Sequence, residues 1–466
     1  MLFNSLHFLF FFPAIWILYQ FAGKYKSILL VIASFYFYMA WNYYFIALLL
    51  FSIVIDYYAS LSISKLEIQD PKRKLYLILS LVTNIGFLAY FKYTNFLLGI
   101  WNDFGIGGYR FPIYDIILPV GISFYTFQSM SYTIDVYRGL IPARKSFLEF
   151  SLYVSFFPQL VAGPIVRATT FFRDLENRLP VDLEVFRSSF AQILLGFTKK
   201  VVFADNLAVC VDLVYANPQN YGSVDTWIAV FAFMWQIYFD FSGYTDIAIG
   251  VARLFGFQFD INFYFPFNVT SVSEHWSRWH ISFTSWIRDY IFIPLGGSRG
   301  SEWIVCRNIF ITLLFGGIWH GAGMNFLYWG IWNASMLVIE RQYAKTKIRT
   351  FFTAKGGYVY LGLCKIATLV CLALGLPLFR GETTNDAFIM FTNMFELANF
   401  FKEPVLMFPY LKLILLLFIS AQIFQRYNSK RMLLNPRSYT MFILANFIMI
   451  LCFAVTEAKS FIYFAF

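Results

Sequence analysis

The chain has 466 residues, of which 59% are hydrophobic and only 13% are charged, against roughly 25% charged residues in a typical soluble domain. Phe, Tyr and Trp supply 22% of the residues, more than the surface of a soluble protein can expose to water. This composition excludes disordered, coiled-coil and disulfide-scaffold proteins and predicts an all-α polytopic membrane protein. The net charge of +10 is then explained by cytoplasmic loops rich in Lys and Arg, and no nucleic-acid partner is expected.

The first third of the chain contains five apolar segments, each long enough to cross a hydrocarbon core of ~30 Å as a helix. We expect helices near residues 5–21, 28–45, 46–63, 75–98 and 116–134. They alternate so that the N-terminus lies outside and the basic loop 65–74 lies in the cytoplasm, as the positive-inside rule requires. No Lys or Arg precedes Lys24 and no small-residue cleavage site follows the first apolar run, so this first helix is expected to be retained.

The segment from residue 140 to residue 335 breaks this regularity with prolines, glycines and ionisable residues. Four prolines interrupt its apolar runs: Pro158, Pro164, Pro266 and Pro294. Non-helical backbone at membrane depth is tolerated only where protein buries it or where it lines a wet cavity. We therefore expect short, tilted or re-entrant helices in this segment, and we look for the functional site there.

Charge also sets the topology of the C-terminal part. Helices are expected near residues 358–378 and 405–424, and the acidic stretch between them, Arg380 to Glu403, is expected outside. The basic clusters at residues 341–349 and 426–437 are expected in the cytoplasm. The sequence thus predicts roughly 10 to 12 helices in a single transmembrane domain 1–466, with N-terminal helices in 1–115, a central core in 116–335 and C-terminal helices in 336–466.

His320 is the most informative ionisable residue, because the surrounding segment 311–330 contains no Lys, Arg, Asp or Glu. A charge at the centre of a membrane helix costs ~2.5 to 3.5 kcal/mol on insertion scales, so such residues are functional candidates. The alternative is a neutral histidine bonded to a backbone carbonyl in a helix contact. Four glycines around it allow close approach by another helix or by a substrate: Gly316, Gly317, Gly321 and Gly323.

A second cluster lies at residues 273–300, where Arg278 and Trp279 precede His280. A helix here would be amphipathic, and the alternative is an interfacial helix with an aromatic belt and snorkelling arginines. His275 and His280 are spaced i,i+5, which does not place both rings on one helical face for zinc. The five cysteines are scattered without a CxxC pair, so no metal site is expected.

Two carboxylates, Asp240 and Asp246, lie six residues apart in the otherwise apolar segment 235–250. Nearby hydroxyl groups, including those of Ser242 and Tyr244, are able to satisfy them. Intramembrane carboxylates of this kind occur in proton relays and ion sites. Hydrogen-bonded structural carboxylates would give the same pattern, and the sequence leaves both interpretations open.

Five motifs follow one another along the core. They are LPVGISFYTFQSMSYTID at 118–135, FFPQLVAGPIVR at 156–167, FDFSGYTDIAIG at 239–250, WSRWHISFTSWIRDYIFIPLGG at 276–297 and GGIWHGAGMNFLYWG at 316–330. In content and order they resemble the membrane-bound O-acyltransferases, most of all the bacterial alginate O-acetyltransferase branch, over residues 115–335. Relatives often carry a second basic residue where this chain has Ser277, and a His-Gly pair where it has Trp332 and Asn333.

The resemblance implies acyl transfer from a cytoplasmic thioester, acetyl-CoA or an acyl carrier protein, through a membrane-buried tunnel in the core, without a bound cofactor. It implies that His320 is the catalytic general base, worth roughly 10²- to 10⁴-fold in rate. His280 maps onto the second active-site position, where it would orient the thioester or stabilise the oxyanion. Residues of the same motifs are the candidates for substrate binding: Asp240, Ser242, Tyr244, Asp246, Arg278, Trp279, Trp319 and Asn325.

The resemblance further implies a multi-pass protein of the bacterial cytoplasmic membrane, surrounded by membrane lipid, that serves a cell-envelope or extracellular polysaccharide. An SGNH-type acyltransferase outside the cytoplasm is the expected protein partner, because this chain has no large soluble domain to do that work. The polysaccharide would accept the acyl group directly or through that partner.

Other functions remain open from the sequence. D-alanyl transfer, or acylation of a lipid or protein, would use the same family chemistry. A transporter or flippase with Asp240 and Asp246 as coupling carboxylates would predict inverted repeats, and the sequence shows none. A membrane scaffold for secretion would leave the intramembrane His320 without an explanation.

Overall fold

The chain is helical wherever the structure describes regular secondary structure. The computed structural model describes residues 1–105, 109–397, 404–406, 410–415, 435–455 and 459–462. These residues form two compact units. Unit 1 comprises Met1–Gly196 with Tyr244–Asp260, and unit 2 comprises Phe197–Gly243 with the described part of Ile261–Ile462. The 32-residue helix α12 (Ser223–Leu254) contributes its N-terminal part to unit 2 and its C-terminal part to unit 1.

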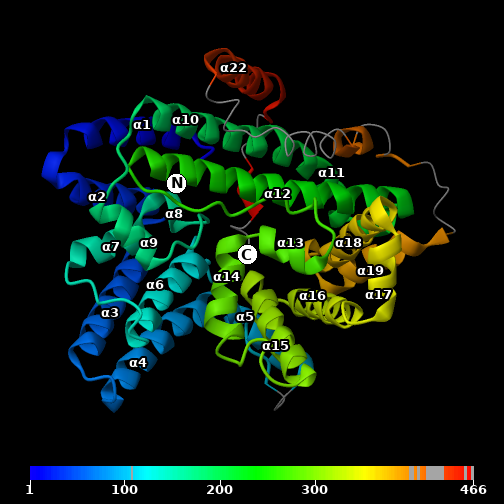
Figure 1. Cartoon of the computed structure of the whole chain (residues 1–466), viewed down its shortest axis with the longest axis horizontal. Helices are drawn as coiled ribbons and strands as arrows, with labels where there is room; N and C mark the ends of the chain where they lie inside the picture. Colours follow the sequence, from blue (N-terminus) through cyan, green and yellow to red (C-terminus); the bar gives the residue numbers. More distant parts are fainter. Residues whose placement is uncertain (106–108, 398–403, 407–409, 416–434, 456–458, 463–466) are drawn as a thin grey trace. The chain divides into compact units, whose positions relative to one another are not determined.

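Unit 1 holds the N-terminal helices (Figure 1). They are α1 (Leu6–Phe21), α2 (Lys26–Met39), α3 (Ile46–Lys65), α4 (Pro71–Leu88), α5 (Thr94–Phe104), α6 (Ile122–Tyr137), α7 (Phe147–Ser155), α8 (Phe157–Leu160), α9 (Ala168–Glu176) and α10 (Leu183–Phe197). The short turns η1 (Gly23–Tyr25), η2 (Tyr43–Phe45) and η3 (Ala89–Tyr93) join some of them.

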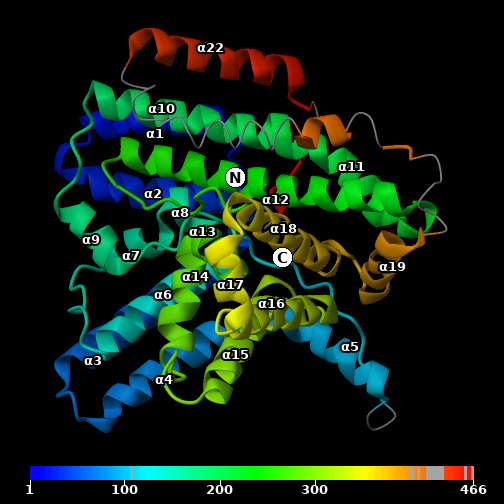
Figure 2. The ribbon, with the colours of Figure 1, turned by 45° about the vertical axis from the view of Figure 1, so that its right-hand side comes forward.

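Unit 2 holds most of the other helices that the structure describes (Figure 2). They are α11 (Asp205–Ala216), α13 (Val272–Arg278), α14 (Ile281–Ile287), α15 (Glu302–His320), α16 (Met324–Tyr343), α17 (Lys347–Lys355), α18 (Gly357–Arg380), α19 (Thr384–Phe395) and α22 (Pro436–Phe453). Two π-helical turns, η5 (Thr198–Ala204) and η7 (Arg288–Phe292), precede α11 and follow α14, and the 3₁₀ turn η6 (Pro218–Asn220) follows α11.

The all-α prediction is confirmed, and the chain is a polytopic membrane protein. Among the residues that the structure describes, five helical segments are long and apolar enough to cross a membrane: Tyr43–Lys65, Pro71–Phe104, Glu302–His320, Gly357–Arg380 and Pro436–Phe453. The helix predicted near 358–378 is α18, and the helix predicted near 46–63 is α3. Of the helix predicted near 405–424, residues 410–415 are helical and the rest lies largely outside the described residues, as do Arg426, Lys430, Arg431, Lys402 and Glu403.

The interrupted middle of the chain forms short helices, as predicted from its prolines. The helices α7, α8, α9, α13 and α14 have nine residues or fewer, and Pro158 lies in the first turn of α8. In contrast, the 32-residue α12 in the same stretch is long and uninterrupted. The division of one domain into 1–115, 116–335 and 336–466 stays a prediction, because the two compact units interleave along the chain.

A buried carboxylate joins three helices of unit 1. Asp56 on α3 is fully buried and accepts hydrogen bonds from Ser80 at 2.5 Å and from Asn84 at 2.9 and 3.0 Å, both on α4. Ser129 on α6 donates a further hydrogen bond to it. Figures 1 and 2 show α3, α4 and α6 side by side. Because a buried charge must be satisfied by the protein itself, this hub fixes the three helices against one another.

Small residues allow α15 and α16 of unit 2 to pack as a close hairpin. A Cβ atom on Gly330 of α16 would lie 2.8 Å from the carbonyl oxygen of Leu313 on α15. A Cβ atom on Gly317 of α15 would clash with the carbonyl oxygen of Phe326 on α16. Interfaces between membrane helices rely on such small residues, because close backbone approach supplies the packing that water cannot drive.

A buried ion-pair network holds together other parts of unit 2. The Lys200 ammonium on η5 lies 2.6 Å from Asp240 on α12 and 2.9 Å from Asp205 at the start of α11. It also donates to the carbonyl oxygen of Ser460 at 3.1 Å. Asp240 accepts a second hydrogen bond from the backbone N–H of Ile462 at 2.8 Å. All three charged side chains are less than 5% exposed, so each depends on the others for its solvation.

The close contact of Gly330 with the α15 backbone predicts that a larger residue at this position would destabilise the α15–α16 hairpin. Gly330→Ala is expected to destabilise the protein by ~1 to 3 kcal/mol, because the added methyl group overpacks a backbone contact. We would measure the melting temperature and the monodisperse fraction in detergent. The matched control is Gly362→Ala on α18, where nothing lies within 4 Å of the added Cβ. Equal melting temperatures for the two variants would contradict close packing at Gly330.

The Lys200 network predicts a large effect of removing its cation. Lys200→Met should destabilise the protein by ~3 to 5 kcal/mol, because it leaves two buried carboxylates without a positive partner. The control is Arg341→Met, which removes a cation from the exposed pair with Glu302 and should change the melting temperature little. A Lys200→Met variant as stable as Arg341→Met would show that the buried pairs contribute nothing.

Candidate active site

His320 ends the first helix of the α15–α16 hairpin, in unit 2. It is the last residue of α15, and the extended backbone of Gly321 and Gly323 leads from it into α16. Its Nδ1 lies 2.6 Å from the carbonyl oxygen of Gly316, one turn earlier in the same helix. The side chain is 3% exposed. The imidazole is therefore buried and held by the backbone of its own helix.

This hydrogen bond decides the tautomer of the neutral ring. A carbonyl oxygen only accepts hydrogen bonds, so Nδ1 of His320 carries the hydrogen and donates it to Gly316. The lone pair of the neutral imidazole is then on Nε2. The helix-contact interpretation and the catalytic interpretation of His320 are thus compatible, because they use different nitrogen atoms.

Aromatic rings enclose the His320 imidazole. The rings of Phe283, Trp319, Trp329 and Phe379 lie with their centroids between 4.8 and 5.4 Å from it. They come from α14, α15, α16 and α18, so four helices of unit 2 meet around one side chain. Such a surrounding keeps bulk water away from the imidazole and strengthens electrostatic interactions with it.

His280 lies beside two of these aromatic rings, those of Phe283 and Trp319. It is fully buried, and its ring centroid lies 5.1 Å from that of Phe283 and 6.0 Å from that of Trp319. The edge of Phe241 on α12 approaches it at 4.7 Å. His280 and His320, 40 residues apart in the sequence, therefore share Phe283 and Trp319 as neighbours. The structure brings together the two histidines that the sequence singled out.

The backbone of His280 adopts a strained conformation. With φ of 44° and ψ of 53° it is left-handed, which is uncommon for a residue with a side chain. The segments on either side are fixed by the preceding loop, because Ile281 donates to Asn262 at 2.9 Å and Tyr264 donates to Arg278 at 2.9 Å. These bonds hold the break between α13 and α14 at the position that turns His280 inward. Sequence patterns did not predict this break, because no glycine or proline marks it.

Two more of the predicted site residues lie in this hairpin. Trp319 stacks on Phe283 with centroids 4.2 Å apart and so forms the wall between the two histidines. Asn325 is buried at the start of α16 and donates to the carbonyl oxygen of Gly381 at 2.9 Å. Asn325 therefore fixes the end of α18 next to the hairpin, and its assignment to substrate binding stays a prediction.

Arg278 and Trp279 are placed differently from the two histidines. The Arg278 guanidinium pairs with Glu274 at 2.5 Å on the same helix and donates to the carbonyl oxygen of Asn268 at 3.3 Å. The Trp279 ring packs against Phe263 at 5.0 Å and stacks on His275 at 5.6 Å. Their interactions fix α13 and its preceding loop, and the assignment of both residues to substrate binding stays a prediction.

The FDFSGYTDIAIG motif is divided between the two units. Asp240 and Ser242 belong to unit 2, where Asp240 pairs with Lys200 and Ser242 is buried. Tyr244 and Asp246 belong to unit 1, where the Tyr244 ring stacks on Phe3 at 4.5 Å and Asp246 accepts from Gln192 at 3.0 Å. These partners favour the structural interpretation of both carboxylates, and a substrate contact by this motif stays a prediction.

Sequence inspection missed Lys200 and Phe283. In the sequence, Lys200 is the second residue of a basic pair at the end of an apolar run, which gives no signal for a partner. In the structure it lies on the π-helical turn η5 and bonds Asp240. Turns of this kind are frequent at functional sites. Phe283 had no signal among 59 phenylalanines, yet its ring contacts both histidines.

His275 has a structural role in the same unit. Its Nδ1 lies 2.8 Å from the carbonyl oxygen of Pro266, and its ring stacks on Phe267 at 6.0 Å. It is buried and belongs to the loop that supports α13. Like His320, His275 bonds a backbone carbonyl through Nδ1. Its ring, however, contacts Phe267 and Trp279.

This chain is similar to known proteins over most of its length. The model of the membrane-bound O-acyltransferase family matches residues 5–381. The chain is 38% identical to the probable alginate O-acetylase of Pseudomonas aeruginosa over 86% of its own length and 76% of the relative. It is 36% identical to the peptidoglycan O-acetyltransferase of Helicobacter pylori over 70% and 66% of the two chains. The teichoic acid D-alanyltransferase of Bacillus subtilis is 25% identical over 62% and 75%.

These matches extend well beyond the five motifs and cover most of both units. They decide between the functional classes that the sequence left open, because the matching family and the relatives named here are acyltransferases. The chain therefore belongs to the membrane-bound O-acyltransferase family and is a multi-pass membrane enzyme that transfers acyl groups.

Proposed function

We propose that this enzyme transfers an acetyl group from a cytoplasmic acyl thioester to a hydroxyl group of a cell-envelope or extracellular polysaccharide. The observation that carries the proposal is the hydrogen bond from Nδ1 of His320 to Gly316, because it puts the lone pair of the neutral ring on Nε2, where a base needs it. Relatives named alginate O-acetylase and peptidoglycan O-acetyltransferase support acetyl as the acyl group and a polysaccharide as the acceptor.

The proposed reaction needs two proton transfers and one exchange of bonds. Nε2 of His320 takes the proton of the acceptor hydroxyl while the hydroxyl oxygen attacks the thioester carbonyl carbon. The new C–O bond forms, the C–S bond breaks, and the departing thiolate receives the proton from the imidazolium. His280, across Phe283 and Trp319, orients the thioester or stabilises its oxyanion.

The expected orientations of α15 and α18 favour a site that lies away from the cytoplasm. At the start of α15, Glu302 pairs with Arg341 at 3.0 Å, in the basic segment expected in the cytoplasm. His320 ends this 19-residue helix, about 28 Å further along its axis. The end of α18 is expected outside, and there the Phe379 ring lies 5.4 Å from His320. The thioester would thus enter from the cytoplasm and the acceptor from the opposite face.

The rest of the proposal rests on the resemblance to the family. Ten to twelve membrane helices, some of them short and re-entrant, would surround a tunnel for the acyl donor in the bacterial cytoplasmic membrane. The donor is acetyl-CoA or an acyl carrier protein, whose negative charge suits the exposed Lys347 and Arg349 on α17. An SGNH-type partner outside the cytoplasm would pass the acetyl group on to the polysaccharide.

D-alanyl transfer is the second candidate, favoured by the similarity to a teichoic acid D-alanyltransferase. It would use the same proton transfer at His320 with a different acyl group. Offering acetyl and D-alanyl thioesters to the purified protein separates the two, because only the native acyl group should be turned over efficiently.

The proposal predicts a selective loss on removing Nε2 alone. His320→Asn keeps an amide donor close to the position of Nδ1 for Gly316 but has no counterpart of Nε2. Its transfer of radiolabelled acetyl from acetyl-CoA should fall roughly 10²- to 10⁴-fold, while its melting temperature in detergent stays near that of the wild type.

The matched control is His275→Asn, which keeps a donor for the carbonyl oxygen of Pro266 in the same unit. It should retain most of the turnover. If both variants lose activity equally, the loss reflects general disruption of the buried histidines. If His320→Asn remains active while the wild type turns over the thioester, His320 is not the base and the proposal is wrong.

A further inference from the structure

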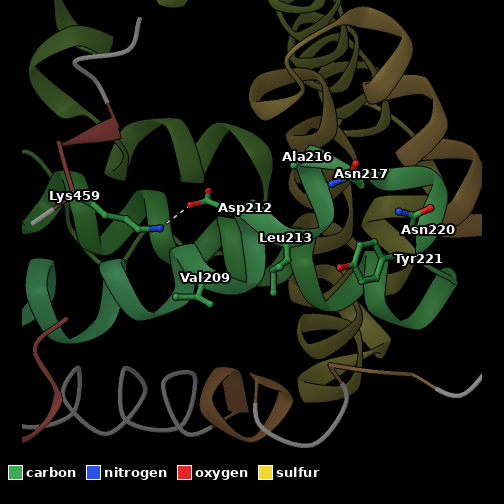
Figure 3. A pocket seen from close by; sticks show the side chains of 8 residues that line it. All are labelled: Val209, Asp212, Leu213, Ala216, Asn217, Asn220, Tyr221 and Lys459. Atoms are coloured by element: carbon green, nitrogen blue, oxygen red, sulfur yellow. Dashed lines mark hydrogen bonds and ion pairs between the residues drawn. The ribbon is translucent and has the colours of Figure 1, made fainter. Parts of the chain in front are cut away.

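Two features of unit 2 have no role in the mechanism above. One is a surface pocket between α11 and the turn η6, in which Lys459 donates to Asp212 at 2.7 Å (Figure 3). Those two charges satisfy each other without a ligand. The other is the side-chain amide of Asn262, a residue of the loop before α13 that is 1% exposed. Among the residues that the structure describes, Nδ2 of Asn262 has no hydrogen-bond partner.

The orientation of this amide follows from its bonds to α14. The backbone N–H and the hydroxyl group of Ser282 both donate to Oδ1 of Asn262, each at 3.0 Å. A backbone N–H only donates, so the amide atom that it faces is the oxygen and not the nitrogen. The two N–H bonds of Nδ2 therefore belong to the other end of the amide, the end that Ser282 leaves unused.

The Asn262 amide is fixed beside His280. The backbone carbonyl of Asn262 accepts from Ile281 at 2.9 Å, and its side chain accepts from Ser282. These two residues directly follow His280 and begin the first turn of α14. Backbone and side chain of Asn262 are thus both bonded within one helical turn of the strained His280.

The unused nitrogen calls for a physical explanation. A buried N–H donor without a partner costs stability, because it has lost its hydrogen bonds to water. Such donors are rare in folded proteins, and strained backbone of the kind seen at His280 is also rare and gathers at functional sites. Both occur here at one place. Holding α14 needs only the oxygen of the Asn262 amide, and an acceptor that arrives with the substrate would satisfy its nitrogen.

We propose that Nδ2 of Asn262 donates a hydrogen bond to the carbonyl oxygen of the acyl thioester and is a further catalytic residue. The inference rests on the proposed function, because it assumes that the thioester carbonyl lies beside His280. As the acceptor oxygen attacks the carbonyl carbon, an electron pair of the C=O bond moves to the carbonyl oxygen, and the amide N–H stabilises the negative charge there. When the C–S bond breaks, the carbonyl forms again and the thiolate takes the proton from the His320 imidazolium. The amide keeps its own hydrogens throughout.

Infrared spectroscopy of bound acetyl-CoA, labelled with carbon-13 at its carbonyl carbon, tests this hydrogen bond directly. The full chain carries His320→Asn, so that the thioester persists during the measurement. We expect the carbonyl band at a lower frequency than in an aprotic solvent, because a hydrogen bond weakens the C=O bond. Adding Asn262→Asp should return the band to a higher frequency, because a carboxylate still accepts from Ser282 but cannot donate.

Turnover gives a second readout. With His320 in place, Asn262→Asp should lower kcat roughly 10²- to 10³-fold, the effect of removing one oxyanion donor, and should change KM for acetyl-CoA much less. The matched control is Asn308→Asp on α15, where the buried amide donates to the carbonyl oxygen of Gly297 at 3.0 Å. This control should lower the melting temperature and leave kcat unchanged.

Three results would overturn the inference. They are a bound carbonyl band in His320→Asn that is absent or no lower than in the aprotic solvent, a band that does not move when Asn262→Asp is added, and equal kcat values for Asn262→Asp and Asn308→Asp. If Asn262→Asp does not fold, Asn262→Leu, which is uncharged and of similar volume, replaces it in both measurements.

The same preparations separate this failure from that of the proposed function. If thioester cleavage by the wild type depends on His320 but not on Asn262, the proposed function stands and the inference falls. If His320→Asn cleaves the thioester as fast as the wild type, the proposed function itself is wrong.

Discussion

Within a hydrocarbon layer no water is available to satisfy a polar group, so each polar side chain of this protein must find its partner inside the chain. Asp56 does so by accepting hydrogen bonds from two other helices, and Lys200 does so by lying between two carboxylates. His320 obeys the same constraint through Gly316, its own backbone neighbour. In the first two cases the constraint stabilises the fold. In the third it also places the lone pair of the neutral ring on Nε2, the atom that we propose as the base.

The close packing of helices extends this argument from single bonds to the whole site. Gly317 and Gly330 bring α15 and α16 together, and the turn at the end of this hairpin holds His320 among aromatic rings from four helices. His280 reaches the same rings through a strained break between two short helices. A strained residue persists only where its surroundings over-determine it, and the backbone bonds to Asn262 and Tyr264 supply that support. The site is therefore built from rigid elements rather than from a mobile loop.

Much of this could be predicted from the sequence. Apolar length and loop charge located α3 and α18 to within a few residues, because both properties are local. His320 could be singled out because an ionisable residue without charged neighbours at membrane depth is costly. The role of the glycines was predicted only in part: close approach was expected, and the approaching group at Gly317 and Gly330 is the partner helix of the hairpin.

Other features depend on long-range contacts that no local pattern contains. Asp240 lacked an identified partner in the sequence, because Lys200 lies 40 residues away and meets it only in the folded chain. The spacing of Asp240 and Asp246 suggested one pair, yet their partners lie in different compact units.

We propose that the α15–α16 hairpin carries His320, as the base, toward the membrane face opposite the donor. Sealed vesicles of defined orientation test it most directly, with radiolabelled acetyl-CoA supplied on one face and the acceptor polysaccharide with its partner protein on the other. We expect labelled polysaccharide only when the donor is on the cytoplasmic face and the acceptor on the opposite face. Equal labelling with donor and acceptor both on the cytoplasmic face would contradict it.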